Sequence, residues 1–305
     1  MTEAFAAAKI NLALHVTGRR VDGYHELDSI VAFADVGDRL RLERAEGFSL
    51  HLEGPFAEGL EAGEDNLALR AAMALARRWP GRFGAARITL EKALPVASGI
   101  GGGSADAAAA LRGMIALHGF TPPEVELREL ALELGADVPV CLSGRACRMG
   151  GIGERLFPLP ELAPLWAVLA NPGVAVSTAE VFAALGLSPG EKGAAALPEE
   201  PPGRAKGAEE TIARLATLRN DLEAPARRLE PAIGTCLEAL GALPGARLAR
   251  MSGSGATCFA LFASAGEAHA AARALRREKP EWWIVATKIH DAEEAPPRER
   301  GFSSI

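Results

Sequence analysis

A glycine-rich segment over residues 95–106, PVASGIGGGSAD, is the part of the chain best suited to hold an anion. Four glycines within positions 99–103 remove the Cβ atoms that would keep a ligand away from the backbone. An alanine-rich run follows, which predicts a helix with Ser104 as its N-cap and with its free amides and positive dipole end facing the segment. The pattern predicts a phosphate site, and a tight turn packed against a neighbouring strand fits the same residues.

Two common nucleotide-binding fingerprints do not fit this segment. A Walker A loop needs a Lys followed by Ser or Thr, and the segment contains no Lys. A dinucleotide fingerprint needs a third glycine where Ser104 stands, and it normally follows the first strand of its domain. A second glycine-rich stretch over 251–256, MSGSGA, is predicted to be a hairpin, or else a backbone surface that a substrate or the first segment can approach closely.

Further polar candidates lie near the N-terminus. From residue 10 to 16 apolar side chains alternate with other residues, a period of two that predicts a half-buried strand. Lys9, Asn11 and His15 then share one face of that strand. A loop over 17–25 is expected next, because it contains two glycines and an Asp-Gly pair, and it carries Tyr24, the only tyrosine, beside His25.

Asp137 stands in the stretch GADVP, which follows a predicted helix over 123–134. Asp at such a bend has an ordinary explanation as a turn former. Ordinary explanations also fit the other candidates, with Lys9 as an exposed strand lysine and Tyr24 and His25 as turn packing. The residues alone leave both interpretations open.

Several motifs taken together resemble those of the GHMP small-molecule kinases: AKINL over 8–12, the glycine-rich segment and SGSGA over 252–256. The stretches DGYH over 22–25 and GADVP over 135–139 narrow the resemblance to the family of 4-diphosphocytidyl-2-C-methyl-D-erythritol kinases of the non-mevalonate isoprenoid pathway. The resemblance covers about residues 6–290. The chain departs from the family's usual GGGSS at Ala105, so a hydroxyl role there is absent or falls to Ser104.

The resemblance implies that ATP phosphorylates the 2-hydroxyl of 4-diphosphocytidyl-2-C-methyl-D-erythritol. It makes Asp137 the base that accepts the hydroxyl proton, and Lys9 the cation that keeps Asp137 ionised and compensates transition-state charge. The cytidine would be recognised by stacking on one ring and hydrogen bonding to another. The residues expected to bind substrate are Asn11, Tyr24, His25, Thr178 and Phe182.

The resemblance also implies a nucleotide site around the glycine-rich segment. The residues expected there are Asn66, Lys92, Pro95, Val96, Ala97, Ser98, Gly99, Ile100, Gly101, Gly102, Gly103, Ser104 and Ala105. For Lys92 a solvated lysine fits equally well. No dedicated metal site is expected, since Mg²⁺ can arrive on the ATP phosphates and their waters. Asp106 would repel phosphate unless Mg²⁺ lay between them, which makes it a candidate outer-shell partner of the ion.

Two alternatives stay open beside this interpretation. The chain could be another GHMP kinase, of the homoserine or mevalonate type, or a non-catalytic nucleotide-binding regulator. The intact Lys9 and Asp137 argue against the regulator.

The elements that must position these residues are predicted from periodicity and turn residues. In the first half we expect strands over 29–34, 39–43, 48–52 and 87–92, and a helix over 66–79 capped by Asp65. In the second half the expected order is a strand over 165–170, a bent helix over 222–240, strands over 247–251 and 257–262, a helix over 266–278 and a strand over 282–289. This β-α-β-β-α-β order is the ferredoxin-like pattern.

The resemblance implies an α+β, two-domain GHMP kinase fold with the active site in the cleft between a ribosomal-S5-like and a ferredoxin-like domain. The proline-rich stretch at 158–164 places the expected boundary, with an N-terminal ATP-binding domain over 1–160 and a C-terminal domain over 161–290. A short helix is expected from Thr178, a surface loop over 188–206 and a flexible tail over 291–305.

Composition limits the possible partners. The 305 residues carry a net charge of -6, so no overall positive field attracts a nucleic acid or an anionic membrane. Four cysteines without metal-ligand spacing predict buried free thiols in a reducing compartment. A signal peptide and a spanning helix are not indicated, so a cytoplasmic protein is expected, as a monomer or weak homodimer. Any phosphate-bearing ligand must therefore be held locally.

Overall fold

The computed structural model describes residues 1–159, 162–199, 205 and 207–290, and within them ten strands join in one mixed sheet. The strands are β1 (Thr2–Arg19), β2 (His25–Arg44), β3 (Ser49–Glu53), β4 (Ala86–Glu91), β5 (Cys147–Gly151), β6 (Arg155–Pro158), β7 (Leu165–Asn171), β8 (Leu248–Met251), β9 (Cys258–Phe262) and β10 (Trp283–His290). The helices are α1 (Leu67–Arg78), α2 (Gly102–His118), α3 (Glu124–Leu134), α4 (Val138–Ser143), α5 (Thr178–Ala183), α6 (Ala208–Ala216), α7 (Glu223–Leu229), α8 (Pro231–Gly241) and α9 (Ala265–Glu278).

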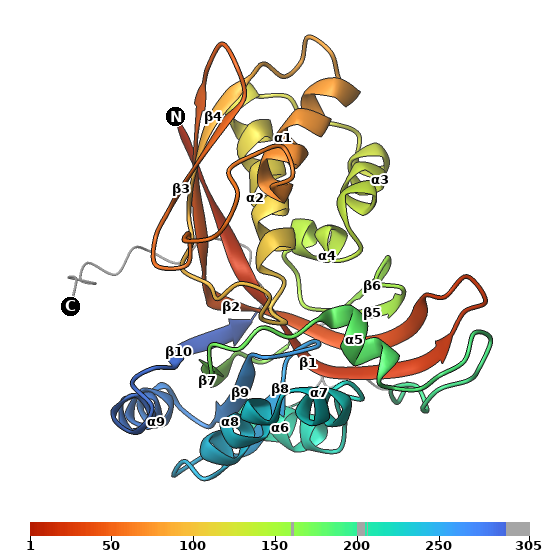
Figure 1. Cartoon of the computed structure of the whole chain (residues 1–305), viewed down its shortest axis with the longest axis vertical. Helices are drawn as coiled ribbons and strands as arrows, with labels where there is room; N and C mark the ends of the chain where they lie inside the picture. The colour runs from red at the N-terminus through yellow and green to blue at the C-terminus, as the bar shows by residue number, and fades with distance from the viewer. Residues whose placement is uncertain (160–161, 200–204, 206, 291–305) are drawn as a thin grey trace.

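A long antiparallel hairpin of β1 and β2 runs through the molecule and links its two halves (Figure 1). Both strands are longer than the sequence predicts, since β1 covers 18 residues and β2 joins two expected strands into one of 20 residues. Gly37 lies inside this merged strand, where a Cβ atom would stand 2.2 Å from the carbonyl oxygen of Ala6. Glycine is therefore needed for the close approach of the two strands rather than to end one of them.

Register shifts in the hairpin set which side chains of β1 face which side. Asn11 pairs with Val31 and Ala13 with Ile30, so β1 carries one extra residue at this point. The extra residue reverses the alternation, and the expectation that His15 shares a face with Lys9 and Asn11 is wrong. The strand is also buried on both faces rather than half-buried, since residues 6–16 are all buried.

In the first half, α1 and α2 pack side by side over one face of the sheet (Figure 1). Ala105 and the alanines of residues 107–110 in α2 are almost fully buried, and their small side chains let the helix lie close to β1 and β2. Both expected N-caps are wrong. The α1 cap is Asn66, whose side chain accepts from the Ala68 amide, and the α2 cap is Gly101, in a left-handed conformation at φ +68°. Only glycine adopts that backbone conformation at little cost.

The second half confirms the ferredoxin-like pattern. Its strands lie in the order β10-β7-β9-β8 with antiparallel neighbours. The expected helix over 222–240 is two helices, since Pro231 starts α8 and α7 ends just before it. The helix α6 lies in a region with no expected element. The short helix at Thr178 is present as α5.

Three groups of buried apolar residues form the core. One lies in the first half, one in the second, and one between them, and β1 supplies residues to all three: Ala6 to the first, Val16 to the second and Ile10 to the third. The expected domain boundary at residue 160 falls on residues 160–161, outside those described, so the division stays a prediction. The expected tail over 291–305 also lies outside the described residues.

The expected surface loop over 188–206 is largely exposed in its described part, and it docks on the end of β1. The amides of Gly190, Gly193 and Ala194 donate to carbonyl oxygens of Arg19, Thr17 and Val16, respectively. Residues 200–204 and 206 lie outside the described part. All four cysteines are buried thiols outside any disulfide, as predicted. No helix of the described chain has the length and apolar character needed to cross a membrane.

Candidate active site

A cleft of about 910 Å³ opens where β1, the N-terminal end of α2, the end of α3, α5 and the β8–β9 loop meet. In Figure 1 the N-terminal end of α2 lies near the centre of the molecule, facing this junction. Expected site residues that line the cleft are Lys9, Asn11, Tyr24, His25, Asn66, Lys92, Pro95, Val96, Ala97, Ser98, Gly99, Gly101, Gly102, Gly103, Ser104, Asp137, Thr178 and Phe182. The fold thus gathers residues that are up to 173 positions apart in sequence around one space.

At the centre of the cleft, Lys9 Nζ lies 2.8 Å from Asp137 Oδ2. The lysine is buried, whereas 38% of the Asp137 side chain is exposed to the cleft. Burial lowers the pKa of the Lys9 ammonium, but the Asp137 carboxylate outweighs this effect, and the pKa is raised above its ordinary value. The pair therefore consists of a fixed cation and an accessible carboxylate.

The chain presents Asp137 by ending one helix and starting another around it. The helix α3 ends at Leu134, Gly135 follows in an extended conformation, and Asp137 is the N-cap of α4. An N-cap side chain usually accepts an amide of its own helix, but the Asp137 side chain makes no such bond. Its carboxylate is instead directed to Lys9.

The glycine-rich segment builds the opposite wall of the cleft. The first bond of α2 runs from the Ala105 amide to the Gly101 carbonyl at 2.8 Å, so the amides of residues 102–104 precede the helical ladder. These amides and the helix dipole have the arrangement expected of an anion site. Gly101 also lets the segment lie on Lys9, since a Cβ atom there would stand 3.3 Å from the lysine Cβ and Cε.

The second glycine stretch is a hairpin loop between β8 and β9 that supports the first, so both interpretations of it are confirmed. A Cβ atom on Gly99 would stand 2.4 Å from the Ser252 carbonyl oxygen, and one on Gly253 would stand 2.5 Å from that of Gly99. Ser252 Oγ accepts from the backbone amide of Asn11 and donates to the backbone carbonyl of Gly99, both at 3.1 Å. Ser252 thus joins β1 to the glycine-rich segment.

Lys92 lies at the cleft but is not a free cation. Its ammonium contacts Asp38 and lies 2.7 Å from Asp106 Oδ2, and all three side chains are buried. Burial lowers the pKa of the Lys92 ammonium, yet its interactions with Asp106 and Asp38 outweigh this effect and raise the pKa overall. The idea of a solvated lysine is wrong, because Lys92 is the centre of a buried ion cluster. Sequence analysis missed Asp38, since it lies 54 residues away on β2.

A group of rings and hydroxyls lines the other end of the cleft. The rings of His25 and Phe182 lie 4.8 Å apart between centroids, and Tyr24 is 60% exposed beside them. Burial, with help from the Arg19 cation, lowers the pKa of His25, so the ring is neutral at pH 7. Its Nε2 atom is buried without a partner in the described structure, which leaves a hydrogen-bonding position for a ligand.

Two further polar contacts complete this end. Asn11 Nδ2 donates to Ser29 Oγ at 2.8 Å, and Asn11 Oδ1 is buried without a described partner. Thr178 Oγ1 lies 2.8 Å from Ser254 Oγ, which links α5 to the second glycine stretch. Ser254 was not among the expected site residues. The glycine spacing around it could have pointed to it, because such loops often approach ligands.

Two expected nucleotide-binding residues do not line the cleft. Ile100 is fully buried in the core between the two halves, and only its carbonyl serves the site by accepting from the Lys9 amide at 3.0 Å. Ala105 is buried against the sheet, and its amide is already used within α2. His15 is displaced from this face by the extra residue in β1, and its Nδ1 lies 2.9 Å from the Ala195 carbonyl oxygen.

A cleft that combines a helix N-terminus, a Lys–Asp pair and ring side chains fits a phosphotransferase acting on a small molecule. Residues 66–145 match the family described as GHMP kinases N terminal domain, and residues 195–281 match GHMP kinases C terminal. A solved homoserine kinase from Cytophaga hutchinsonii has the same fold at 18% identity, with a TM-score of 0.67 over 96% of each chain. The α+β GHMP kinase fold is therefore confirmed.

More similar proteins define the family within this class. A 4-diphosphocytidyl-2-C-methyl-D-erythritol kinase of Cereibacter sphaeroides is 57% identical, covering 95% of this chain and 99% of its own. One from Bradyrhizobium diazoefficiens is 51% identical over 92% and 95%. The crystal structure of a 4-(cytidine 5'-diphospho)-2C-methyl-D-erythritol kinase matches with a TM-score of 0.76 and 39% identity, covering 94% and 99%. The chain belongs to the 4-diphosphocytidyl-2-C-methyl-D-erythritol kinases.

Proposed function

We propose that this chain transfers the γ-phosphoryl group of ATP to the 2-hydroxyl of 4-diphosphocytidyl-2-C-methyl-D-erythritol, in the non-mevalonate route to isoprenoids. The observation that carries the chemistry is the Lys9–Asp137 pair, at 2.8 Å, facing the free amides of α2 across one cleft. Phosphoryl transfer depends mainly on positioning and charge neutralisation, which these groups supply. The homoserine and mevalonate alternatives have only the fold in their favour.

In the proposed reaction Asp137 accepts the proton of the substrate hydroxyl as its oxygen attacks the γ-phosphorus. Because Lys9 is buried and remains charged, it holds the Asp137 carboxylate in place through their ion pair and stabilises the negative charge on the transferring phosphoryl group. The β- and γ-phosphates lie against the amides of residues 102–104, and ADP leaves from the same place.

Mg²⁺ is part of the proposal. The described residues contain no group of three or more His, Cys, Asp or Glu side chains placed to hold a metal. The donor set therefore fits an ion carried by the phosphate oxygens of ATP and by water. When bound, it neutralises phosphate charge, and no residue of the chain is assigned as its ligand.

Cytidine recognition is proposed for the ring end of the cleft. The base stacks on Tyr24 and Phe182, while the neutral His25 ring supplies a hydrogen bond through Nε2. Asn11 Oδ1 and Thr178 Oγ1 are available to the hydroxyl groups of the substrate. We also propose a cytoplasmic protein that acts as a monomer or weak homodimer on small molecules alone.

An ATP-consumption assay tests the function. We expect turnover with 4-diphosphocytidyl-2-C-methyl-D-erythritol and none with homoserine or mevalonate. Asp137→Asn is expected to lower kcat by about 10²–10⁴-fold because the proton acceptor is lost, with MgADP binding retained. Tyr24→Ala is expected to raise KM for the cytidine substrate. Activity on homoserine or mevalonate, or near wild-type turnover by the Asp137 variant, contradicts the proposal.

A further inference from the structure

The cluster of Asp38, Lys92 and Asp106 has a use that the proposed reaction does not explain. Asp38 Oδ1 accepts the amides of Ala93 at 2.6 Å and Leu94 at 2.9 Å, and its other oxygen contacts Lys92. Both oxygens of Asp38 are therefore used. Asp106 Oδ2 accepts from Lys92 at 2.7 Å, but Asp106 Oδ1 is buried with no described partner.

The unpartnered oxygen belongs to a residue that lines the nucleotide end of the cleft while only 4% of it is exposed. A Cβ atom on Gly102 would stand 3.8 Å from Lys92 Nζ and 4.0 Å from Asp38 Oδ2, so the cluster lies directly beside the first residue of α2. Helical side chains point back toward the N-terminus, which directs Asp106 toward the amides of residues 102–104. A phosphate bound at those amides would therefore lie on the side of α2 toward which Asp106 points.

The charges of the cluster determine whether Asp106 is ionised or protonated beside a bound phosphate. Lys92 compensates one carboxylate, and Asp38, with two amides as well, holds its negative charge best. An ionised Asp106 would then place an uncompensated negative charge beside a bound phosphate, in a buried site where such repulsion is strong. A protonated Asp106 removes that charge and offers an O–H donor.

The pKa of the Asp106 carboxyl agrees with this geometry. Burial, followed by repulsion from Asp38, raises the pKa of the Asp106 carboxyl to about 8, although Lys92 acts in the opposite direction. The titratable groups that face it are Asp38 from β2, Lys92 after β4 and Cys141 from α4. Burial raises the pKa of the Cys141 thiol to about 12, so this thiol stays neutral in the same pH range.

We propose that Asp106 holds a proton at neutral pH and donates it through Oδ1 as a hydrogen bond to a phosphate oxygen of the bound nucleotide. The proposal rests on the nucleotide site of the proposed function. It replaces the expected outer-shell contact of Asp106 with Mg²⁺.

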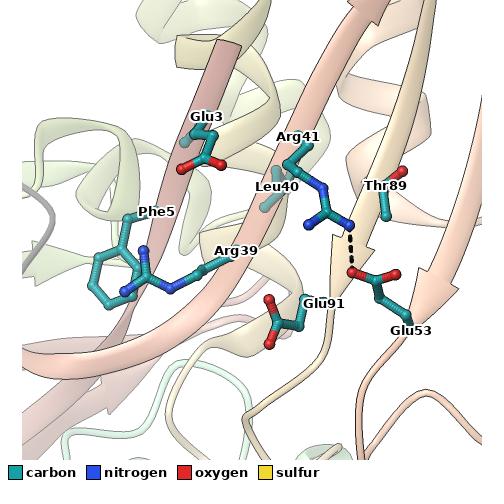
Figure 2. A pocket seen from close by; sticks show the side chains of 9 residues that line it. Glu3, Phe5, Arg39, Leu40, Arg41, Glu53, Thr89 and Glu91 are labelled. Carbon is teal, nitrogen blue, oxygen red and sulfur yellow. Dashed lines mark hydrogen bonds and ion pairs between the residues drawn. The ribbon is translucent and has the colours of Figure 1, made fainter. Parts of the chain in front are cut away.

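Calorimetric binding of MgADP between pH 7 and pH 9.5 tests this role. For the wild-type chain we expect Kd to rise by up to about 30-fold, because one proton is needed for tight binding. Asp106→Asn keeps the shape and a donor without the titration, so its Kd at pH 7 is expected within about threefold of wild type and unchanged up to pH 9.5. Glu91→Gln, a carboxyl-to-amide change on the outer face of the sheet, is the matched control and should follow the wild type (Figure 2).

Infrared spectroscopy gives a second readout that a purely structural role would not change. We expect a carbonyl stretch of a protonated carboxyl in the wild-type chain at pH 7, shifted when MgADP binds and missing from the Asp106→Asn variant. A wild-type Kd that does not change with pH overturns the proposal. So does an equal rise of Kd in the Asp106 variant, or a tenfold weaker Kd at pH 7, which is the result expected of a cation ligand. Failure of the wild-type chain to bind MgADP at any pH overturns the proposed function itself.

Discussion

The buried ammonium of Lys9 and the partly exposed carboxylate of Asp137 form the ion pair at the centre of the cleft. Lys9 cannot leave its position, because its stem lies against Gly101 and its Nζ against Asp137. Asp137 has one face toward the cleft, where a substrate hydroxyl can reach it. The arrangement needs a compact charge at residue 9, and the planar fork of arginine has a different shape.

The first prediction concerns that shape. Lys9→Arg keeps the charge but places a larger planar group where a Cβ on Gly101 would already be 3.3 Å from the stem. We expect kcat to fall by about 10²-fold or more, since a single misplaced stabilising group has effects of that size. Steady-state kinetics measures it, with MgADP affinity as the control for an intact nucleotide site. Full activity of the variant would show that residue 9 supplies charge alone.

The second prediction concerns pH and stability. Because the pKa of Asp106 is raised when the chain folds, the folded state keeps a proton that the unfolded state releases near pH 4. The contribution of this group to the free energy of unfolding is therefore lost as pH rises from about 4 to about 8. In urea titrations, Asp106→Asn should gain stability relative to the wild type across this window. A constant difference between the two chains at pH 5 and pH 8 contradicts the raised pKa.

At this scale the sequence predicts individual contacts unevenly. Lys9 and Asp137 could be chosen from their motifs, but the 2.8 Å pair depends on β1 and α4 meeting. Lys92 lines the cleft, as expected, but its burial and its ion pair with Asp38 were not predicted, because Asp38 comes from a distant strand. Ion partners that are far apart in sequence leave no local pattern.

At the scale of elements, the two glycine stretches act as one unit. Gly99 has φ +74°, and a Cβ atom there would overlap the carbonyl oxygen of Ser252 and the amide nitrogen of Gly255 at 2.4 and 2.7 Å. Backbone atoms cannot move aside as a flexible side chain can. The hairpin loop of the second half thus supports the glycine-rich segment of the first half.

The third prediction follows from this contact. Gly99→Ala is expected to lower the free energy of unfolding by more than about 2 kcal/mol and to abolish tight MgADP binding, since strain and overlap add. Gly103→Ala is the matched control for stability, because its Cβ would have no neighbour within 4 Å and its φ is ordinary. Urea unfolding measures both. Equal stability of the two variants would show that the loops move apart at no cost.

Elements with strong local signals were predicted well. The helix after the glycine-rich segment, the short helix at Thr178 and the β-α-β-β-α-β order all appear. Their ends were less predictable. Ser104 has the right type for an N-cap, but Gly101 holds that position because the chain must turn in a left-handed conformation to lie on Lys9. The extra residue in β1 is likewise a property of strand pairing and leaves no trace in the alternation of side chains.

On the outer face of the sheet, by contrast, the alternation of polar and apolar residues along a strand is enough to predict which side chains face solvent. Polar side chains of β1 to β4 gather there around a hollow of about 60 Å³, with an ion pair between Arg41 and Glu53 at 2.6 Å and Arg39 over the Phe5 ring (Figure 2). The alternate residues, such as Leu40 and Leu42, are fully buried beneath the helices. This face is an ordinary solvated surface.

At the scale of the whole molecule, β1 makes the two halves interdependent. It contributes to each of the three cores, and it forms the Lys9 side of the cleft. Neither half can lose its core without exposing part of this strand. The cleft between the halves is therefore built on a shared strand and does not depend on a flexible linker.

The fourth prediction is that both halves unfold together. Cys141 and Cys147 are buried in the first-half core, and Cys236 and Cys258 in the second. Pulsed thiol labelling in urea, read by mass spectrometry, should give one midpoint for all four. Midpoints that differ between the two pairs by more than the error of the measurement would show that the halves unfold separately.

The structure of the whole molecule also explains how a chain with a negative net charge can offer a site for anions. The chain carries -6 overall, yet its site can accept phosphate-bearing ligands through uncharged amides, a helix end and one buried lysine. Composition predicts that such ligands are held locally. It could not show where, because the cleft is assembled from many separate stretches of chain between residues 9 and 254.

The pairing of β2 with β10 has a consequence for synthesis. Phe33 pairs with His290 and Ala34 with Ile289, so a strand made early closes against one made about 250 residues later. At roughly 5–20 residues per second the ribosome needs on the order of 15–50 s to deliver that partner. During this time the end of β1 that packs in the second half carries apolar residues, such as Leu14 and Val16, whose core partners from residue 168 onward are not yet made. Because exposed apolar surface favours aggregation, we expect protection of this intermediate to affect the yield of folded protein.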